Sequence, residues 1–266
     1  MNQPSLFETP WHVENIDECE FYHTIDLPKY GVIQGCWDLR ENIDAYLGNF
    51  DFSGKTALDV GTAGGLLTFY MENKGAKVTS FDLSSGQLWN IVPYIHPEYN
   101  LMEKRNGFIF TAERFKKGYW FSHKALGSQA QCHYGNIYNI SQDLGVFDVA
   151  VMGTIISHLR DPIQALFSVS LRVKDYIILA NPTMDTKDPI ALWMPDSNTQ
   201  SPLAAWWAFS HTCLERMFNV IGFEVETITK SQHLCEVSTK GKYSDEITTI
   251  VARRKYSSPV EITPDF

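Results

Sequence analysis

The sequence predicts a doubly wound α/β fold, in which helices cover both faces of a mostly parallel sheet. A strand, a glycine-rich turn, a helix and a second strand follow one another between residues 55 and 82. Further apolar strand segments recur downstream, with helix-capping signals between them. A chain of 266 residues with 44% hydrophobic and 20% charged residues suffices for one such folded domain.

The first unit is the clearest. Lys55–Val60 is a short apolar segment typical of a buried strand, and Gly61–Gly65 follows it directly. A helix is expected over Leu66–Asn73 with Gly75 as its C-terminal stop, and Lys77–Asp82 is the second strand. A strand–helix–strand connection of this kind joins parallel strands of a buried sheet.

The other elements follow along the chain. Five more strands are expected, at Ala130–Tyr134, Phe147–Met152, Tyr176–Ala180, Phe223–Thr229 and Thr248–Arg253. Asp161 and Ser210 are expected to cap two helices, the second of which stops at Gly222. Because no helix separates the last two strands, we expect a closing hairpin with one antiparallel strand in a sheet of seven.

Three segments are not needed to build this sheet: residues 1–50, about 88–120 and 181–209. We expect residues 1–50 to form an N-terminal helical lid, with a helix-like stretch at Asp38–Leu47. The other two segments interrupt the domain of residues 51–266 after its second and fifth strands. Ligands bind at the carboxyl ends of strands in such sheets, so these two segments are expected to build the substrate pocket.

The charge balance, the cysteine spacing and the absence of long apolar runs argue against nucleic-acid, metal and membrane-bound functions. Lys and Arg total 22 against 31 Asp and Glu, a net charge of −9 without a long basic run, which argues against nucleic acid as a partner. The five cysteines are scattered without a C-x-x-C spacing, so we expect no metal site and a reduced, cytoplasmic protein. The sequence shows neither a signal-peptide pattern nor an apolar run of membrane length, so no membrane partner is expected.

The glycine turn indicates a nucleotide-type ligand, because glycines allow such a ligand to approach backbone amides closely. A dinucleotide fingerprint needs glycine where this chain has Ala63 and Leu66, which disfavours a dehydrogenase. Asp82 ends the second strand 21 residues after Gly61. A carboxylate at that place accepts hydrogen bonds from both ribose hydroxyls.

These motifs resemble those of the class I S-adenosyl-L-methionine (SAM) methyltransferases. Leu58–Gly65 is similar to their motif I, Gly135–Tyr138 to the segment flanking the adenine, and Phe147–Thr154 to motif IV, within about residues 50–255. The resemblance implies a Rossmann-like fold, SAM as methyl donor and Asp82 on the ribose. The candidate cofactor-binding residues are Asp59, Gly61, Thr62, Gly64, Gly65, Asp82, Leu83, Asn136, Ile137 and Gly153, with Trp37 contributed by the lid.

Within that superfamily the chain is similar to the branch around the tRNA wobble-uridine carboxymethyltransferases. The residues concerned are His158–Pro162, Asn181-Pro182, Trp206-Trp207 and Ile221–Phe223. In the tRNA enzymes a tyrosine precedes the matching histidine and helps hold the carboxylate of carboxy-SAM, whereas this chain has Ser157. Together with the negative net charge, this replacement favours ordinary SAM and a small acceptor.

His158 is the candidate catalytic residue, since the pKa range of histidine suits a general base at neutral pH. The alternative is a structural hydrogen bond at a helix entry. Six tryptophans lie outside the expected strands and favour an apolar pocket, in which Trp37 would shield the sulfonium by cation–π attraction.

We therefore expect a SAM-dependent methyltransferase that acts on a hydroxyl, amine or carbon of a small-molecule acceptor. Methyl transfer from a sulfonium gains most from alignment and exclusion of water, so a general base is optional. Two alternatives stay open: a tRNA-modifying enzyme of the wobble-uridine type, and a non-catalytic SAM-binding subunit. Binding of tRNA at moderate salt distinguishes the first, and absence of turnover the second.

Overall fold

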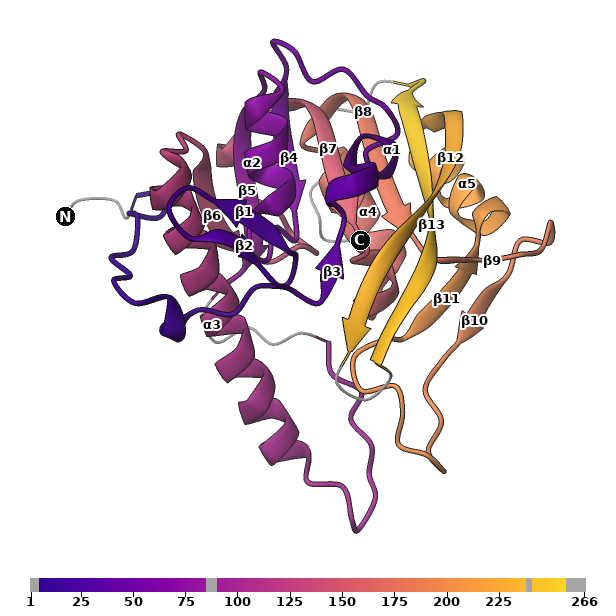
Figure 1. Cartoon of the computed structure of the whole chain (residues 1–266). Coiled ribbons are helices and arrows are strands. Elements are labelled where there is room, and N and C mark those ends of the chain that lie inside the picture. Colours follow the sequence, from indigo (N-terminus) through magenta and orange to yellow (C-terminus); the bar gives the residue numbers. More distant parts are fainter. Residues whose placement is uncertain (1–4, 85–89, 238–240, 257–266) are drawn as a thin grey trace.

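An eight-stranded sheet forms the centre of the protein (Figure 1). The computed structural model describes residues 5–84, 90–237 and 241–256. In order across the sheet the strands are β3 (Trp37–Asp38), β12 (Phe223–Val237), β13 (Gly241–Arg254), β8 (Val173–Asn181), β7 (Phe147–Gly153), β4 (Thr56–Val60), β5 (Lys77–Leu83) and β6 (Gln131–Gly135). β4 to β8 are parallel neighbours, and β13 is antiparallel to both β8 and β12. The predicted mostly parallel α/β sheet with a closing hairpin is confirmed.

Helices flank this sheet. The α-helices are α1 (Ile43–Tyr46), α2 (Leu66–Asn73), α3 (Leu101–Leu126), α4 (Pro162–Ser170) and α5 (His211–Val220). Short 3-10 helices lie at η1 (Ile16–Glu18), η2 (Arg40–Asn42), η3 (Gln142–Leu144) and η4 (Ile156–His158). The bounds predicted for α2 are those observed, and the side chains of Asp161 and Ser210 cap α4 and α5 as expected.

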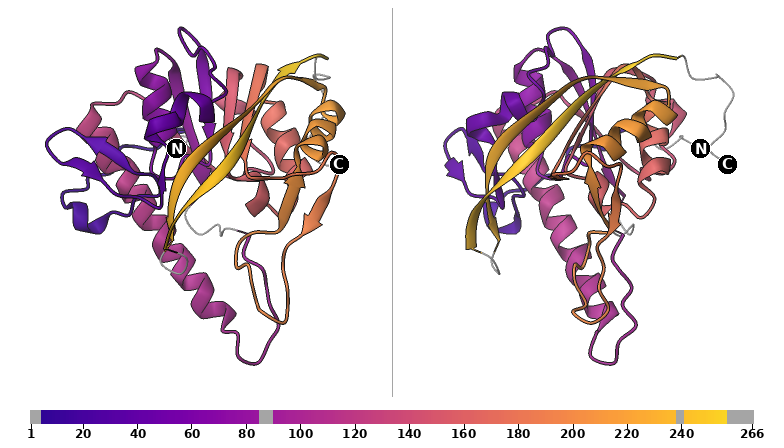
Figure 2. Two further views of the ribbon diagram at one scale, coloured as in Figure 1. Left: turned by 45° about the vertical axis from the view of Figure 1, so that its right-hand side comes forward. Right: turned by 90° about the vertical axis from the view of Figure 1, so that its right-hand side faces the viewer.

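The sheet separates two apolar cores, because successive side chains of a strand point to opposite faces. On β7, Val149 and Val151 belong to the core beneath α2, α3 and the N-terminal segment. Ala150 and Met152 belong to the core beneath α4 and α5. The views in Figure 2 show helices on both faces and the long β12–β13 hairpin curling across one end of the sheet.

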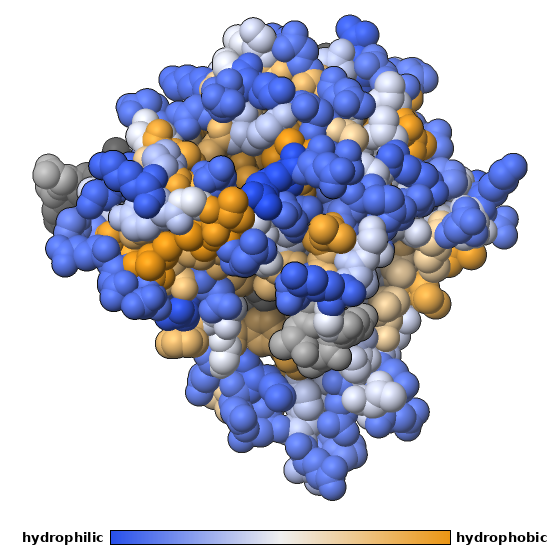
Figure 3. Space-filling model, viewed as in Figure 1, coloured by the Kyte–Doolittle hydropathy of each residue, from blue (hydrophilic) through white to orange (hydrophobic). Residues whose placement is uncertain are grey.

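The N-terminal extension is built into this core. Ile25–Leu27 (β1) and Gly31–Ile33 (β2) form a hairpin, and β3 adds the eighth strand by pairing with β12. Of the expected helix over Asp38–Leu47, only η2 and α1 are helical, although the side chains of Leu39, Ile43 and Leu47 are all buried. Figure 3 shows hydrophobic surface over the β1–β2 hairpin, where Val32 is exposed.

The aromatic insertion expected after the second strand is mostly one long helix, α3. The sequence assigns residues 88–120 to the substrate pocket without predicting a helix there, and residues 88 and 89 lie outside the described part of the chain. The Asn100 side chain accepts a hydrogen bond from the Glu103 N–H at 3.0 Å, and Gly127 closes the helix in the left-handed conformation. These two capping residues are the sequence signal for α3.

The second insertion forms a small sheet of β9 (Thr183–Met184), β11 (Trp207–Ser210) and β10 (Ala191–Trp193). We call residues 90–100 and 194–206 together the cap. Its two segments protrude on the same side of the molecule as the N-terminal half of α3 (Figure 1). The Val92 N–H donates to the Leu203 carbonyl at 3.0 Å and the Tyr94 hydroxyl to the Pro202 carbonyl at 3.0 Å, which ties the two segments together.

Among the helices of the described residues, none combines the length and the apolar character needed to cross a lipid bilayer.

Candidate active site

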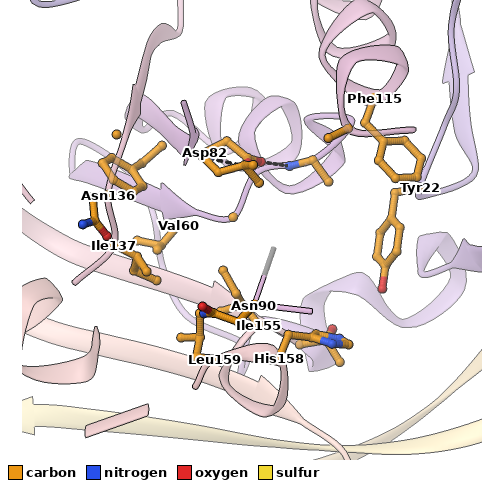
Figure 4. A pocket seen from close by; sticks show the side chains of 18 of the residues that line it. Tyr22, Val60, Asp82, Asn90, Phe115, Asn136, Ile137, Ile155, His158 and Leu159 are labelled. Atoms are coloured by element: carbon orange, nitrogen blue, oxygen red, sulfur yellow. Dashed lines mark hydrogen bonds between the residues drawn. The ribbon is translucent and has the colours of Figure 1, made fainter. Parts of the chain in front are cut away.

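A cavity of about 420 Å³ lies where the parallel strands end. Because the carboxyl ends of β4, β5, β6 and β7 meet at one edge of the sheet, the loops that follow these strands converge there. The cavity is lined by Tyr22, Val60, Gly61, Ala63, Phe81, Asp82, Leu83, Asn90, Ala112, Phe115, Lys116, Gly135, Asn136, Ile137, Tyr138, Gly153, Thr154, Ile155, His158 and Leu159. Figure 4 shows Asn136 and Ile137 at one end, and Tyr22, Phe115 and His158 toward the other.

The glycine turn connects β4 to α2 beside this cavity. Gly61 and Gly65 have φ angles of +80° and +87°, a region that L side chains rarely adopt. A Cβ on Gly65 would also lie 2.5 Å from the Phe69 ring. Of the three glycines only Gly61 lines the cavity, so the backbone conformation and internal packing require Gly65, rather than ligand approach.

Asp82 places a carboxylate at the cavity wall. Its Oδ2 accepts a hydrogen bond from the Ala63 N–H and its Oδ1 one from the Leu83 N–H, both at 2.7 Å. Burial raises the pKa of Asp82, and these two backbone donors, with Lys116 nearby, oppose that rise. Each carboxylate oxygen keeps acceptor capacity toward the cavity.

Asp59 lies beneath the turn and does not line the cavity. Its Oδ2 accepts a hydrogen bond from the Thr68 hydroxyl at 2.6 Å, and the Thr68 hydroxyl lies 2.9 Å from that of Thr62. The buried Oδ1 has no hydrogen-bond partner among the described atoms. Burial raises the pKa of Asp59 to about 6. Asp59 and Thr62 therefore tie the turn to α2 from inside the core.

The end of the cavity near Asn136 is largely apolar. Phe81, Leu83 and Ile137 contribute side chains there, and the Asn136 side chain accepts a hydrogen bond from the Tyr138 N–H at 3.0 Å, which fixes the loop after β6. Gly153 lines the cavity floor, where a Cβ would lie 2.9 Å from the Tyr46 hydroxyl. The N-terminal extension thus supports the floor of the site.

His158 lies at the end of η4 and is accessible from the cavity. Its Nδ1 is 2.6 Å from the Ala204 carbonyl oxygen in the cap. Since a carbonyl only accepts, Nδ1 carries the proton and donates. The surrounding protein lowers the pKa of His158 through desolvation, so the ring is neutral at pH 7 and Nε2 keeps its lone pair.

The structure brings together seven of the predicted site residues: Gly61, Asp82, Leu83, Asn136, Ile137, Gly153 and His158. Asp59, Thr62, Gly64 and Gly65 lie in or under the turn without lining the cavity. Trp37 is on the edge strand β3 and also stays outside it, but its backbone N–H donates to the carbonyl of Tyr22 at 3.0 Å, and Tyr22 does line the cavity.

Sequence reasoning missed Tyr22, Asn90, Phe115 and Lys116 as lining residues. Phe115 and Lys116 lie in the insertion already expected to build the pocket, and with Ala112 they recur at the i, i+3, i+4 spacing of one face of α3. Tyr22 is close to the cavity only because the N-terminal segment crosses the carboxyl ends of the strands, and no local sequence signal marks it.

Comparisons with known proteins agree with this fold. A model of the methyltransferase-domain family matches residues 37–228. A protein described as a methyltransferase, from Bacillus halodurans C-125, is similar in structure with 13% identity over 81% of this chain and 100% of its own, at a TM-score of 0.53. A protein described as an RNA methyltransferase, from Pyrococcus horikoshii, has 11% identity over 80% of both chains and a TM-score of 0.51.

A third similar structure is that of 1,6-didemethyltoxoflavin-N1-methyltransferase from Burkholderia thailandensis with bound S-adenosylhomocysteine. Its sequence is 14% identical over 80% of this chain and 75% of its own, and the TM-score is 0.48. A comparison with curated proteins finds no match. The family model covers well over half of the sequence. The chain therefore belongs to the methyltransferase-domain family, and S-adenosyl-L-methionine is its cofactor.

Proposed function

We propose that the protein transfers a methyl group from SAM to a small-molecule acceptor bound in the cavity between Asp82 and His158. The observation that carries this proposal is the cavity itself. A carboxylate lies in its wall, an unprotonated imidazole nitrogen lies toward the end opposite Asn136, and the walls between are mostly apolar.

The residues around the cavity fit SAM. The two oxygens of Asp82 each keep a lone pair for the two hydroxyls of a ribose, and Phe81, Leu83 and Ile137 offer apolar surface to a flat adenine. The unpartnered Oδ1 of Asp59 is an acceptor beneath the same turn. When bound, SAM supplies a methyl group on a positively charged sulfur.

The chain's own residues orient the reactants and exclude water. Ala63 and Leu83 hold the Asp82 carboxylate by their N–H groups, so the ribose ligand is oriented before binding. The apolar side chains of Phe115, Ile155 and Leu159 line the same cavity as His158 and offer surface that an acceptor covers when it binds, which displaces water from the reacting groups.

A small acceptor is favoured over tRNA by charge and by the cap. The net charge of −9 opposes approach of a polyanion, and the cap borders the cavity through Asn90 and its contact with His158. The similarity to the wobble-uridine branch is a hypothesis that the same experiment tests.

The test measures binding and turnover separately. Calorimetry is expected to detect binding of SAM and S-adenosylhomocysteine, and release of S-adenosylhomocysteine is expected with a small-molecule filtrate of cell extract but not with bulk tRNA. Turnover with tRNA alone would support the tRNA-modifying alternative. Binding without turnover on either substrate would support a non-catalytic subunit, and absence of binding would contradict the proposal altogether.

A further inference from the structure

We propose that the acceptor is an uncharged molecule with an apolar body and a weakly acidic hydroxyl, and that Nε2 of His158 takes the proton of that hydroxyl. This inference rests on the proposed methyl transfer and assigns the acceptor class that the sequence left open among hydroxyl, amine and carbon.

The first support is the fixed protonation state of His158. The Ala204 carbonyl, 2.6 Å from Nδ1, holds the proton on that nitrogen, and the lowered pKa keeps the ring neutral. Nε2 is therefore a hydrogen-bond acceptor at the cavity and a base. An acceptor that brings a proton donor satisfies Nε2, whereas a ligand without one leaves it unpaired.

The second support is that the cap holds this histidine from two sides. The backbone N–H of Trp206 donates to the carbonyl of Ser157, the residue before His158, at 2.8 Å. The indole N–H of Trp206 donates to the Asn90 carbonyl. This hydrogen bond ties the cap segment of residues 90–100 to the tryptophan that contacts Ser157. His158 is thus oriented by the same segments that border the acceptor side of the cavity.

The third support is the distribution of charge. Among the described residues that line the cavity, the ionised side chains are Asp82 and Lys116. Lys116 pairs with Glu113 at 3.0 Å and lies 4.6 Å from the centre of the Tyr134 ring. Asp82 accepts hydrogen bonds from the Ala63 and Leu83 N–H groups, and its carboxylate lies across the cavity from His158 (Figure 4).

Near His158 the walls are instead uncharged, with Tyr22, Phe115, Ile155 and Leu159. Burial raises the pKa of Tyr22, so its hydroxyl also stays neutral. Binding an ammonium or a carboxylate here would cost desolvation without an opposite charge to offset it. A neutral amine would bind without that cost, but its lone pair needs no base. Its N–H also donates to Nε2, so the hydroxyl is distinguished by its need for a base: its oxygen becomes a strong nucleophile only when Nε2 takes its proton.

The chemical step balances with these groups. The acceptor O–H bond breaks and its proton passes to Nε2, giving an imidazolium. The oxygen forms a bond to the methyl carbon while the carbon–sulfur bond breaks with its electron pair on sulfur. The products are a methyl ether and an uncharged thioether.

The experiment compares three probes of one shape in the presence of saturating S-adenosylhomocysteine. These are 4-methylphenol, 4-methylaniline and 4-methylbenzoate, which at pH 7.5 present an un-ionised hydroxyl, a neutral amine and a carboxylate on the same body. We expect calorimetry to show at least tenfold tighter binding of the phenol than of either analogue. With ¹⁵N-histidine-labelled protein, NMR should show a shift of the Nε2 resonance of His158 when the phenol binds, because that nitrogen then accepts a hydrogen bond from the hydroxyl, and no such shift with the benzoate.

In His158→Ala and His158→Gln the preference for the phenol should fall at least tenfold, and the two variants control for any loss of folding in one of them. Equal affinity for the three probes, no binding of the phenol, or an unchanged Nε2 signal would overturn the inference. Binding of S-adenosylhomocysteine in the same samples separates the outcomes, because its absence contradicts the proposed function rather than the acceptor class.

Discussion

At the scale of single residues, the two aspartates of the site have different environments and different roles. Asp82 lies in the cavity wall, and its oxygens are partly occupied by the Ala63 and Leu83 N–H groups. Asp59 is buried beneath the turn with one oxygen unpartnered. The first is positioned to bind a ligand, whereas the second supports the turn at a cost in stability.

Asp82→Asn is expected to reduce the affinity for S-adenosylhomocysteine at pH 7.5 by about tenfold or more, since a hydrogen bond to a charged group contributes roughly 1.5–3 kcal/mol. Because the pKa of Asp82 is raised, wild-type affinity should also fall as the pH is lowered through that pKa. Calorimetry measures both effects. The exposed Asp143→Asn is the control, and an unchanged affinity in Asp82→Asn would remove Asp82 from the ligand site.

The raised pKa of Asp59 leads us to expect that the difference in stability between the wild type and Asp59→Asn depends on pH. Its pKa is raised from 3.8 to about 6 in the folded protein, so the folded state binds the proton more tightly than the unfolded state. The stability from that proton is complete below pH 4 and is lost as the pH rises through 6, a change of about 3 kcal/mol. The Asp59→Asn variant does not lose this stability at higher pH, because the asparagine side chain does not titrate.

The unfolding free energy of Asp59→Asn, relative to wild type, should therefore rise by about 3 kcal/mol between pH 4 and pH 8. Denaturant titrations at several pH values measure it, and the other titrating groups cancel because both proteins contain them. A difference that is constant with pH would show that the Asp59 carboxyl titrates normally in the folded protein.

At the scale of elements, the cap links two insertions that are far apart in the sequence. Val92, Tyr94 and Trp206 form a small apolar cluster of their own, apart from the two main cores. Through Ala204 and Trp206 this cluster reaches His158 and Ser157. The orientation of the candidate base therefore depends on the packing of the cap.

Trp206→Phe keeps an aromatic ring in this cluster and removes the indole N–H that donates to the Asn90 carbonyl. We expect the cap to loosen and the desolvation of His158 to lessen, so the pKa of its imidazole should rise toward the ordinary value of about 6.5. An NMR titration of ¹⁵N-labelled histidines measures that pKa. Trp11→Phe, at a tryptophan that packs against the core on the other face of the sheet, is the control, and equal pKa values in the two variants would contradict a positioning role for Trp206.

At the scale of the whole molecule, the N-terminal extension and the sheet form a common core. Phe21, Ile25 and Leu27 belong to the same apolar cluster as Leu67 of α2 and Val149 of β7. The same extension brings Tyr22 to the cavity. It therefore contributes to folding as well as to the site.

Leu27→Ala should lower the unfolding free energy of the entire protein by about 2–5 kcal/mol, the usual cost of deleting a buried leucine side chain. Leu27 is 1% exposed, whereas Val32 on the same hairpin is 45% exposed, so Val32→Ala is the control. Thermal unfolding followed by circular dichroism should show one transition shifted only in Leu27→Ala. An unshifted main transition would mean that the hairpin opens separately, as a detachable lid would.

The order of the seven predicted strands (β4 to β8, β12 and β13) and of α2, α4 and α5 was predictable because its signals are local. The apolar segment at Thr56–Val60, the glycines after it and the capping residues Asp161 and Ser210 each act within a few residues. The short strand β3 was not predictable, because two residues carry no pattern and their pairing with β12 spans almost 200 positions.

The sequence by itself determined the parallel sheet, the turn beside Asp82 and the family to which these motifs belong, since alternation, capping and glycine conformation are properties of neighbouring residues. Only the tertiary structure decided which side chains face the cavity. It placed Tyr22 there rather than Trp37, and it set the proton of His158 on Nδ1 through a carbonyl 46 residues away in the chain. Such contacts depend on how distant segments pack, because the hydrogen bond that fixes a tautomer and the burial that shifts a pKa come from partners that no local pattern names.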